Sequence, residues 1–236
     1  MNRVITVTRL HFNKPGTALA TPLGIIVIVW VVSLIIALAL QRAGLDPSNP
    51  EYAAGARNNA GIMWSLPGFL IYYGVQAVAT TFPFALALGT TRRAYVAGTA
   101  LASLIHAAFI TAVLAVLLLL ELVTGHWFFD LYVFDVAVLG SGNLWTLIAT
   151  SFIGVFLCLT IGSVFGAIWV RFGAKGPLVL GLALGLLLAV GVLIAVPYFA
   201  DIVAWMTGLK LALMTLGIAA LALIGTWACM RRTSVR

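Results

Sequence analysis

Charge is the property that this sequence has least of. Only 8% of its 236 residues are Asp, Glu, Lys or Arg, whereas 63% are apolar and the mean hydropathy is +1.16. A soluble globular domain has roughly a quarter charged residues and about 45–50% apolar ones. A chain so poor in charge cannot cover a water-facing globule with polar side chains. The composition therefore excludes an ordinary soluble domain and indicates a membrane protein.

Histidine and cysteine are scarce as well. The three histidines are His11, His106 and His126, and the sequence has no His-Glu-x-x-His motif and no His/Asp/Glu cluster at metal-ligand spacing. Only His106 falls in a long apolar stretch, so paired axial haem ligands are not expected either. The two cysteines, Cys158 and Cys229, lie in apolar stretches and do not indicate a disulfide framework. The sequence thus offers no catalytic constellation, and we expect no metal site.

A phosphate-binding loop is also missing. Gly173-Ala174-Lys175-Gly176 has neither the spacing nor the following Ser or Thr of the Gly-x-x-x-x-Gly-Lys-Ser/Thr motif. The chain is therefore not expected to bind ATP and Mg²⁺ itself or to be an enzyme. Any dependence on ATP requires a partner subunit that carries both.

Six apolar stretches are each long enough to cross a bilayer as a helix, which takes roughly 20 residues. None shows the alternation of membrane strands, so helices are expected. The sequence predicts an all-α integral membrane protein with a single transmembrane domain over residues 1–236. The predicted spans are residues 22–40, 62–88, 95–120, 144–170, 177–199 and 209–230.

The few charges divide by side. With six spans, ten of the thirteen basic residues share one side with both termini, and all six acidic residues fall on the other. Lys and Arg collect in cytoplasmic loops, so both termini are predicted to be cytoplasmic, in the cell membrane. The net charge of +7 then reflects topology and attraction to anionic membrane lipid. It does not indicate nucleic-acid binding.

Two segments are expected to lie on the membrane. Residues 1–16 interleave apolar and basic side chains, which predicts an amphipathic helix in the cytoplasmic headgroup layer, with a disordered anchor as the alternative. A cleaved signal peptide is disfavoured because the following apolar run is too long. Residues 121–143 carry five aromatic residues, which favours a short helix on the outer surface, with a gate as the alternative.

Polar residues inside the spans are functional candidates by default. Gln76 and His106 are the clearest, and both are candidates for the substrate path. His106 lies about 16 Å along the helix from Tyr95, near mid-bilayer. It could contact a substrate, relay protons, or only bond to a neighbouring helix.

Residues 84–99 hold the most specific pattern in the chain. A leucine-rich span ends in Leu-Gly, followed by two small polar residues, Arg-Arg, an aromatic residue and a glycine. This pattern resembles that of permease subunits of type-two ABC export transporters. The matching residues are Leu88, Gly89, Thr90, Thr91, Arg92, Arg93, Tyr95 and Gly98.

The resemblance implies a permease that works as a dimer, expected to be of identical copies, bound to separate cytoplasmic ATPase subunits. In that family this connection is a coupling helix, so Gly89 to Tyr95 would meet the ATPase. Arg171 and Lys175 would form a smaller second contact, residues 1–16 a connecting helix, and the second and fifth spans the substrate path. The alternatives are the substrate-binding membrane subunit of a vitamin or metal importer and, less favoured, a membrane-embedded enzyme.

Overall fold

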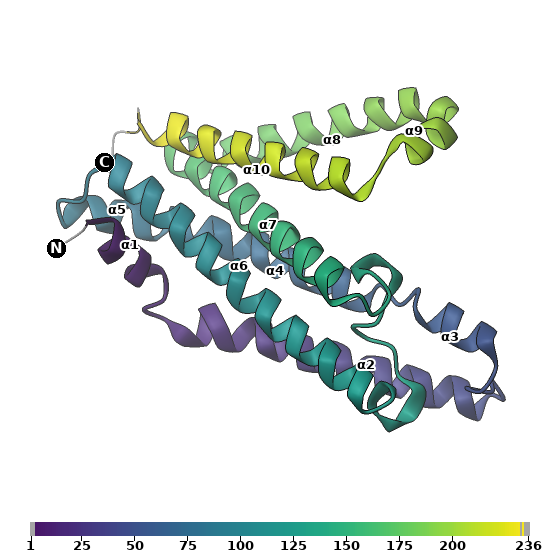
Figure 1. Cartoon of the computed structure of the whole chain (residues 1–236). Helices are drawn as coiled ribbons and strands as arrows, with labels where there is room; N and C mark the ends of the chain where they lie inside the picture. The colour runs from purple at the N-terminus through teal and green to yellow at the C-terminus, as the bar shows by residue number, and fades with distance from the viewer. Residues whose placement is uncertain (1–2, 232, 234–236) are drawn as a thin grey trace.

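A computed structural model describes residues 3–231 and residue 233. The described residues form helices and no strands (Figure 1). In chain order the elements are α1 (Arg3–His11), η1 (Gly16–Ala20), α2 (Thr21–Arg42), α3 (Pro50–Ala56), α4 (Gly61–Ala79), α5 (Thr81–Ala87), α6 (Arg92–Val123), η2 (His126–Asp130), η3 (Ala137–Leu139), α7 (Leu144–Phe172), α8 (Lys175–Ala195), η4 (Val196–Tyr198), α9 (Phe199–Trp205) and α10 (Gly208–Met230).

Six helical stretches are long and apolar enough to cross a membrane, which confirms the predicted number and places them within the described residues. They are Gly16–Arg42, Pro50–Ala87, Arg92–Val123, Leu144–Phe172, Lys175–Trp205 and Gly208–Met230. The fifth is longer than expected, because a turn and the short helix α9 extend it to Trp205.

The second predicted span, residues 62–88, is two helices and not one. The chain bends at Thr80, where α4 ends and α5 begins. Pro83 has no N–H to bond the carbonyl of Ala79, and its ring crowds that carbonyl. The hydroxyls of Thr80 and Thr81 also donate to the carbonyls of Gln76 and Ala77, a bond that favours helix bending.

Helix α7 lies at the centre of the bundle, packed by α4, α6 and α10. Its contact with α4 runs through three glycines, Gly74 on α4 and Gly162 and Gly166 on α7. A Cβ at any of them would lie within 3 Å of the backbone or a side chain of the other helix. Small residues allow this backbone approach between membrane helices. The Gly162-x-x-x-Gly166 pattern of the sequence, one of two in which glycines recur four residues apart within a span, is therefore a real contact.

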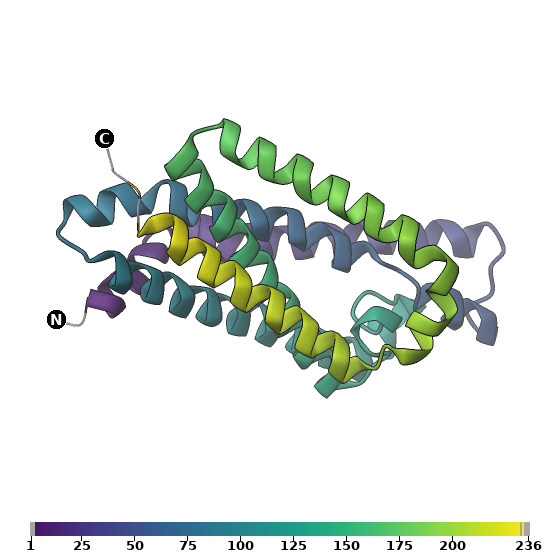
Figure 2. The ribbon, with the colours of Figure 1, turned by 90° about the horizontal axis from the view of Figure 1, so that it is seen from above.

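The other pattern, Gly181-x-x-x-Gly185, lies on α8 and meets nothing within 4 Å. No residue of α8 or α9 is buried against the described part of the chain, and α8 exposes a continuous run of Leu and Val. Figure 2 shows α8 standing apart from the bundle, joined to it mainly where it leaves α7. This side of the molecule is left for lipid or for another subunit.

The two ends of the bundle differ. Both termini, α1, α5 and the start of α6 lie at one end, called here the termini end (Figure 1). The segment that joins α6 to α7 lies at the other, called here the cap end. Because the six long helices alternate in direction, most of the described basic residues lie at the termini end and the acidic residues lie at the cap end, where Arg42, Arg57 and Lys210 are the exceptions.

The glycine contact between α4 and α7 gives a stability prediction. Gly162→Ala should lower the free energy of unfolding by about 2 kcal/mol, because the new methyl group forces the two backbones apart. Gly181→Ala is the matched control on α8, where the added Cβ meets nothing. Thermal unfolding of the two variants in the same detergent checks this. Equal midpoints would contradict the packing.

Candidate functional site

The termini end has its own small apolar core, separate from the main one. Seven buried residues from six helices form it: Val7, Val78, Phe82, Ala85, Tyr95, Ala167 and Met230. Tyr95 is fully buried, and its ring lies edge-on to Phe82. Its hydroxyl donates to the carbonyl of Ala77 at 2.8 Å, across the α4–α5 bend. Tyr95 therefore ties the start of α6 to the bend and lies beneath the surface, not on it.

The predicted coupling connection is a tight turn above this core. Gly89 has φ +78°, a backbone conformation that favours glycine, and Thr91 caps α6 by accepting the N–H of Ala94. Leu88 is 68% exposed, and Arg93 is exposed beside it. The turn thus presents an apolar and a cationic side chain to the outside of the termini end.

The two adjacent arginines have different surroundings. Arg92 donates through Nη1 to the carbonyl of Arg231 and through Nη2 to the carbonyl of Thr233, both at 2.6 Å. These are carbonyls at and just beyond the C-terminal end of α10, where a cation is favourable. Arg93 has no ion pair or hydrogen bond with a described residue. Arg92 fastens α6 to the end of α10, and Arg93 remains available to a partner.

The two residues of the predicted second contact lie at this same end. Arg171 ends α7 and approaches the carbonyl of Ala228 on α10 at 3.5 Å, a long and weak contact. Lys175 begins α8 and is exposed. Arg171 therefore lies beside α10, and Lys175 lies just beyond the turn that joins α7 to α8.

Helix α1 packs on α6 by a face that is half polar. Val7, Thr8 and His11 are buried, whereas Ile5, part of the apolar pattern in the sequence, is 46% exposed. The contact centres on Gly98, where a Cβ would overlap Val7. The predicted helix in residues 1–16 is thus present, but a protein contact fixes it.

Hydrogen bonds pin α1 at its buried face. The Thr8 hydroxyl donates to the carbonyl of Gly98 at 3.1 Å, and His11 Nε2 lies 3.0 Å from the hydroxyl oxygen of Thr99. The Tyr73 hydroxyl of α4 donates to the carbonyl of His11 at 2.9 Å. Burial lowers the pKa of His11 to about 4, so the ring is neutral at pH 7.

The structure brings the two substrate-path candidates to neighbouring cavities. Gln76 lines a groove between residues 10–17 and the α4–α5 bend, and His106 lines a small pocket beneath it. His11, Tyr73 and Ala77 line both cavities. His106 is 1% exposed, and neither ring nitrogen has a hydrogen-bond partner among the described residues.

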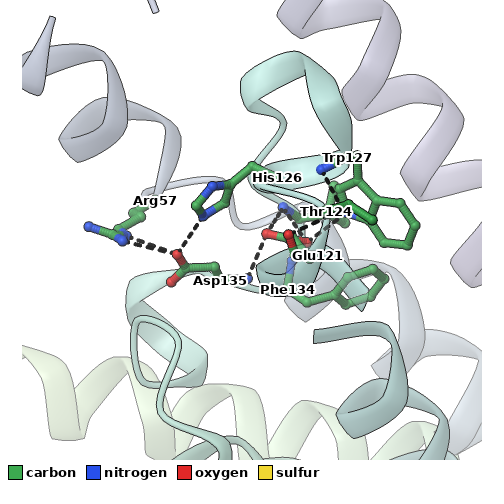
Figure 3. Close-up of polar contacts among 8 residues, drawn as sticks. Arg57, Glu121, Thr124, His126, Trp127, Phe134 and Asp135 are labelled. Carbon is green, nitrogen blue, oxygen red and sulfur yellow. Dashed lines mark hydrogen bonds and ion pairs between the residues drawn. The ribbon is translucent and has the colours of Figure 1, made fainter. Parts of the chain in front are cut away.

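At the cap end, the chain from residue 124 to residue 143 folds inward around Glu121 (Figure 3). This carboxylate, fully buried, accepts backbone N–H groups from Val133, Phe134 and Asp135 and the indole N–H of Trp127, at 2.9–3.3 Å. Hydrogen bonds to an ionised acceptor are about twice as strong as neutral ones. The expected surface helix is therefore replaced by an irregular plug, because Glu121 collects the N–H groups that a helix would use internally.

A second carboxylate joins this plug to the chain between α3 and α4. Asp135 is 1% exposed, and one of its oxygens lies 3.0 Å from both Arg57 Nη2 and His126 Nε2 (Figure 3). Tyr132 stacks on the ring of His126 and lies under the guanidinium of Arg57. Both carboxylates of the plug thus bond to its own chain and neighbouring segments.

The arrangement favours no metal or catalytic chemistry. Within the described ranges no three His, Cys, Asp or Glu side chains come together as metal ligands. Comparison of the chain with protein-family models, with curated proteins and with solved structures gives no match.

Two features were beyond the sequence patterns. The plug around Glu121 depends on N–H groups 12–14 residues further on, and the site of α1 docking depends on Gly98, 91 residues after Val7. The sequence did carry a signal for the plug. Glu121 lies at the end of a span, and an acidic residue there is costly in lipid unless it has partners. The half-polar face of α1 gave no comparable signal.

The docking of α1 should depend on pH. The pKa of His11 falls from its ordinary 6.5 to about 4 in the docked helix, so an undocked helix binds a proton more readily. Docking is strongest above pH 6.5 and should weaken by up to about 3 kcal/mol as the pH falls to 4. A spin label at Ile5→Cys, with Cys158 and Cys229 replaced by alanine, should become mobile over this range.

The control for this experiment is His11→Asn, which cannot titrate. Its label mobility should not change between pH 6.5 and pH 4. A transition that persists in His11→Asn would show that another group controls α1.

The plug should depend on the charge of Glu121. Glu121→Gln places an amide donor among four N–H donors and should cost about 3 kcal/mol of unfolding free energy. Glu51→Gln is the control, an exposed glutamate at the same end of the molecule. Thermal midpoints measured side by side check this, and a Glu121→Gln protein as stable as Glu51→Gln would refute it.

Proposed function

We propose that this chain is the membrane-spanning subunit of an ATP-driven ABC exporter, working as a dimer with separate cytoplasmic ATPase subunits. One observation carries the proposal. The turn at residues 88–91 stands on a compact core that joins α1, α4, α5, α6, α7 and α10, and it exposes Leu88 and Arg93 at its tip. A partner that moves this tip would move these six helices together.

The proposed mechanism is alternating access driven by ATPase closure, with ATP and Mg²⁺ on the partner. Arg93 and the turn from Gly89 to Thr91 would contact the ATPase directly. Arg92 would transmit the movement to the end of α10, and Tyr95 would transmit it to the α4–α5 bend, because their bonds lie on those paths. Arg171 and Lys175 would supply the second contact.

The second copy of the chain would cover the open side of the molecule. In this proposal α8 faces the partner copy or the path between copies, which accounts for its continuous exposed apolar surface. Gln76 and His106 would contribute polar groups from the first copy. The cell membrane and the cytoplasmic position of both termini belong to the same proposal.

The importer-type alternative needs polar groups converging on an outward pocket at the cap end. The buried carboxylates there, Glu121 and Asp135, bond to N–H groups, Arg57 and His126 of the chain itself. This arrangement favours a closed plug over a binding pocket, although Asp135 Oδ1 is buried without a partner among the described residues.

The coupling proposal is tested by Arg93→Glu. The tagged chain, purified in mild detergent from its native membranes, should carry a Walker-motif ATPase that mass spectrometry identifies and Mg-ATP hydrolysis detects. Arg93→Glu should lower the retained ATPase at least tenfold, because an exposed cation at a contact becomes an anion. Arg42→Glu, an exposed arginine at the cap end, should retain it.

Arg93 is chosen over Arg92 because Arg92 bonds to the C-terminal end of the chain, so its loss would confuse coupling with folding. Equal retention by Arg93→Glu and wild type, at equal membrane levels, would contradict the proposed contact. The absence of any ATPase from wild type would contradict the ABC assignment.

A further inference from the structure

The groove at the termini end has the size and shape of a ligand site. Its volume is about 620 Å³, within the range of small-molecule pockets. One wall is the segment that joins α1 to η1, and the other is the α4–α5 bend. Its lining residues are Leu10, His11, Asn13, Lys14, Thr17, Tyr72, Tyr73, Gln76, Ala77, Thr80, Thr81 and Phe84.

Polar groups in this groove are without protein partners. Among the described residues, the side chains of Asn13, Lys14 and Gln76 make no hydrogen bond or ion pair. Beneath them, His106 is 1% exposed and also lacks a partner on both ring nitrogens. A neutral imidazole offers one donor and one acceptor. Buried polar groups are nearly always satisfied, so His106 lacks a partner that the chain alone does not supply. Asn13 and Lys14 are exposed and Gln76 is half-buried, so their polar atoms are open to a ligand in the groove.

The charge of the groove selects an anion. Lys14 is its cation, and no Asp or Glu lines it. The charged groups nearby on the packed elements are Arg3 and Arg9 of α1 and Arg92 and Arg93 of α6, all cationic, and His11 is neutral. The acidic residues of the chain lie at the far end of the bundle. An acidic headgroup in this groove is therefore attracted by the cations and is not repelled by any carboxylate that lines it.

The walls select an amphiphile over a free anion. Tyr72 is 55% exposed, Phe84 is 53% exposed, and the stretch between them belongs to a membrane-spanning segment. The groove therefore opens at the level of the bilayer, next to aromatic side chains of the kind that settle at membrane interfaces. An acyl chain can lie along these rings while its headgroup stays at the polar rim.

We propose that this groove is a binding site for an anionic phospholipid of the surrounding bilayer. The phosphate binds at Lys14, Asn13 and Gln76, and an acyl chain packs on Tyr72 and Phe84. The lipid bridges residues 10–17 to the α4–α5 bend, and so it holds α1 against α4 from the side opposite α6. The site is independent of the ATPase, because it consists of this chain alone.

The test is lipid retention by the full chain. Wild type in nanodiscs made of equal phosphatidylglycerol and phosphatidylcholine is released into detergent, and the lipid that stays bound is counted by native mass spectrometry. Wild type should retain phosphatidylglycerol in preference to phosphatidylcholine. Lys14→Glu should lower the retained phosphatidylglycerol about tenfold or more, since each cation near a membrane surface contributes attraction of about fivefold.

Two further variants keep the test sharp. Arg9→Glu makes the same charge change at an exposed residue of α1 that does not line the groove, and it should retain phosphatidylglycerol like wild type. Thr80→Trp fills the groove at an exposed lining residue without changing charge, and it should lose the lipid. All variants must share the wild-type elution profile.

Three results would overturn the proposal. Equal loss of phosphatidylglycerol in Arg9→Glu and Lys14→Glu would indicate general surface attraction, and displacement of the lipid by millimolar glycerol phosphate would indicate a site for soluble anions. The third is a wild type that shows no preference for phosphatidylglycerol over phosphatidylcholine. Because no ATPase is present, failure here leaves the exporter proposal intact, and failure of the Arg93→Glu experiment leaves this one intact.

Discussion

The close approach of α4 and α7 is the contact on which the remaining structure depends. Lipid gives no hydrophobic drive for one apolar helix to leave it for another, so close packing must hold the bundle together. Gly74, Gly162 and Gly166 let two backbones meet over two turns. With α7 fixed there, α6 and α10 pack on its other faces. The α4–α5 bend then lies against the start of α6.

The two ends of this bundle use their polar residues differently. At the cap end, Glu121 and Asp135 are buried and bond to the chain, which makes a plug from an irregular segment, although Asp135 Oδ1 has no partner among the described residues. At the termini end, Arg93 and Lys14 stand without protein partners above packed cores. Both proposals for the termini end rest on these two cations, each of which is free to meet a group from outside the chain.

Much of the fold could be predicted from sequence because its signals are local. Six apolar runs predict six helices without any knowledge of their partners, and the break at Thr80 could have been predicted from Pro83 and two threonines. The irregular plug could not, because helix propensity and aromatic content say nothing of four N–H groups converging on one carboxylate. The same holds for α1, whose buried face is chosen by Gly98 and Thr99 of another helix and not by its own apolar stripe.

The candidate site was predicted in part for the same reason. The turn around Gly89 depends on residues that are adjacent in the sequence, so the pattern of residues 84–99 predicts it. The different roles of Arg92 and Arg93 did not, since only the position of the end of α10 separates them. Likewise, Gln76 and His106 were chosen as isolated polar residues in apolar runs. Their placement on two adjoining cavities is a property of how α4 and α6 pack.

The account depends most on which side of the membrane the termini end faces. Single cysteines at Asp46→Cys, on the cap end, and at Thr90→Cys, on the coupling turn, with Cys158 and Cys229 replaced by alanine, measure this with a membrane-impermeant maleimide. The account predicts labelling of Asp46→Cys in intact cells and of Thr90→Cys only after permeabilisation. The reverse pattern would place the turn out of reach of ATP and of any cytoplasmic ATPase, and would contradict the account.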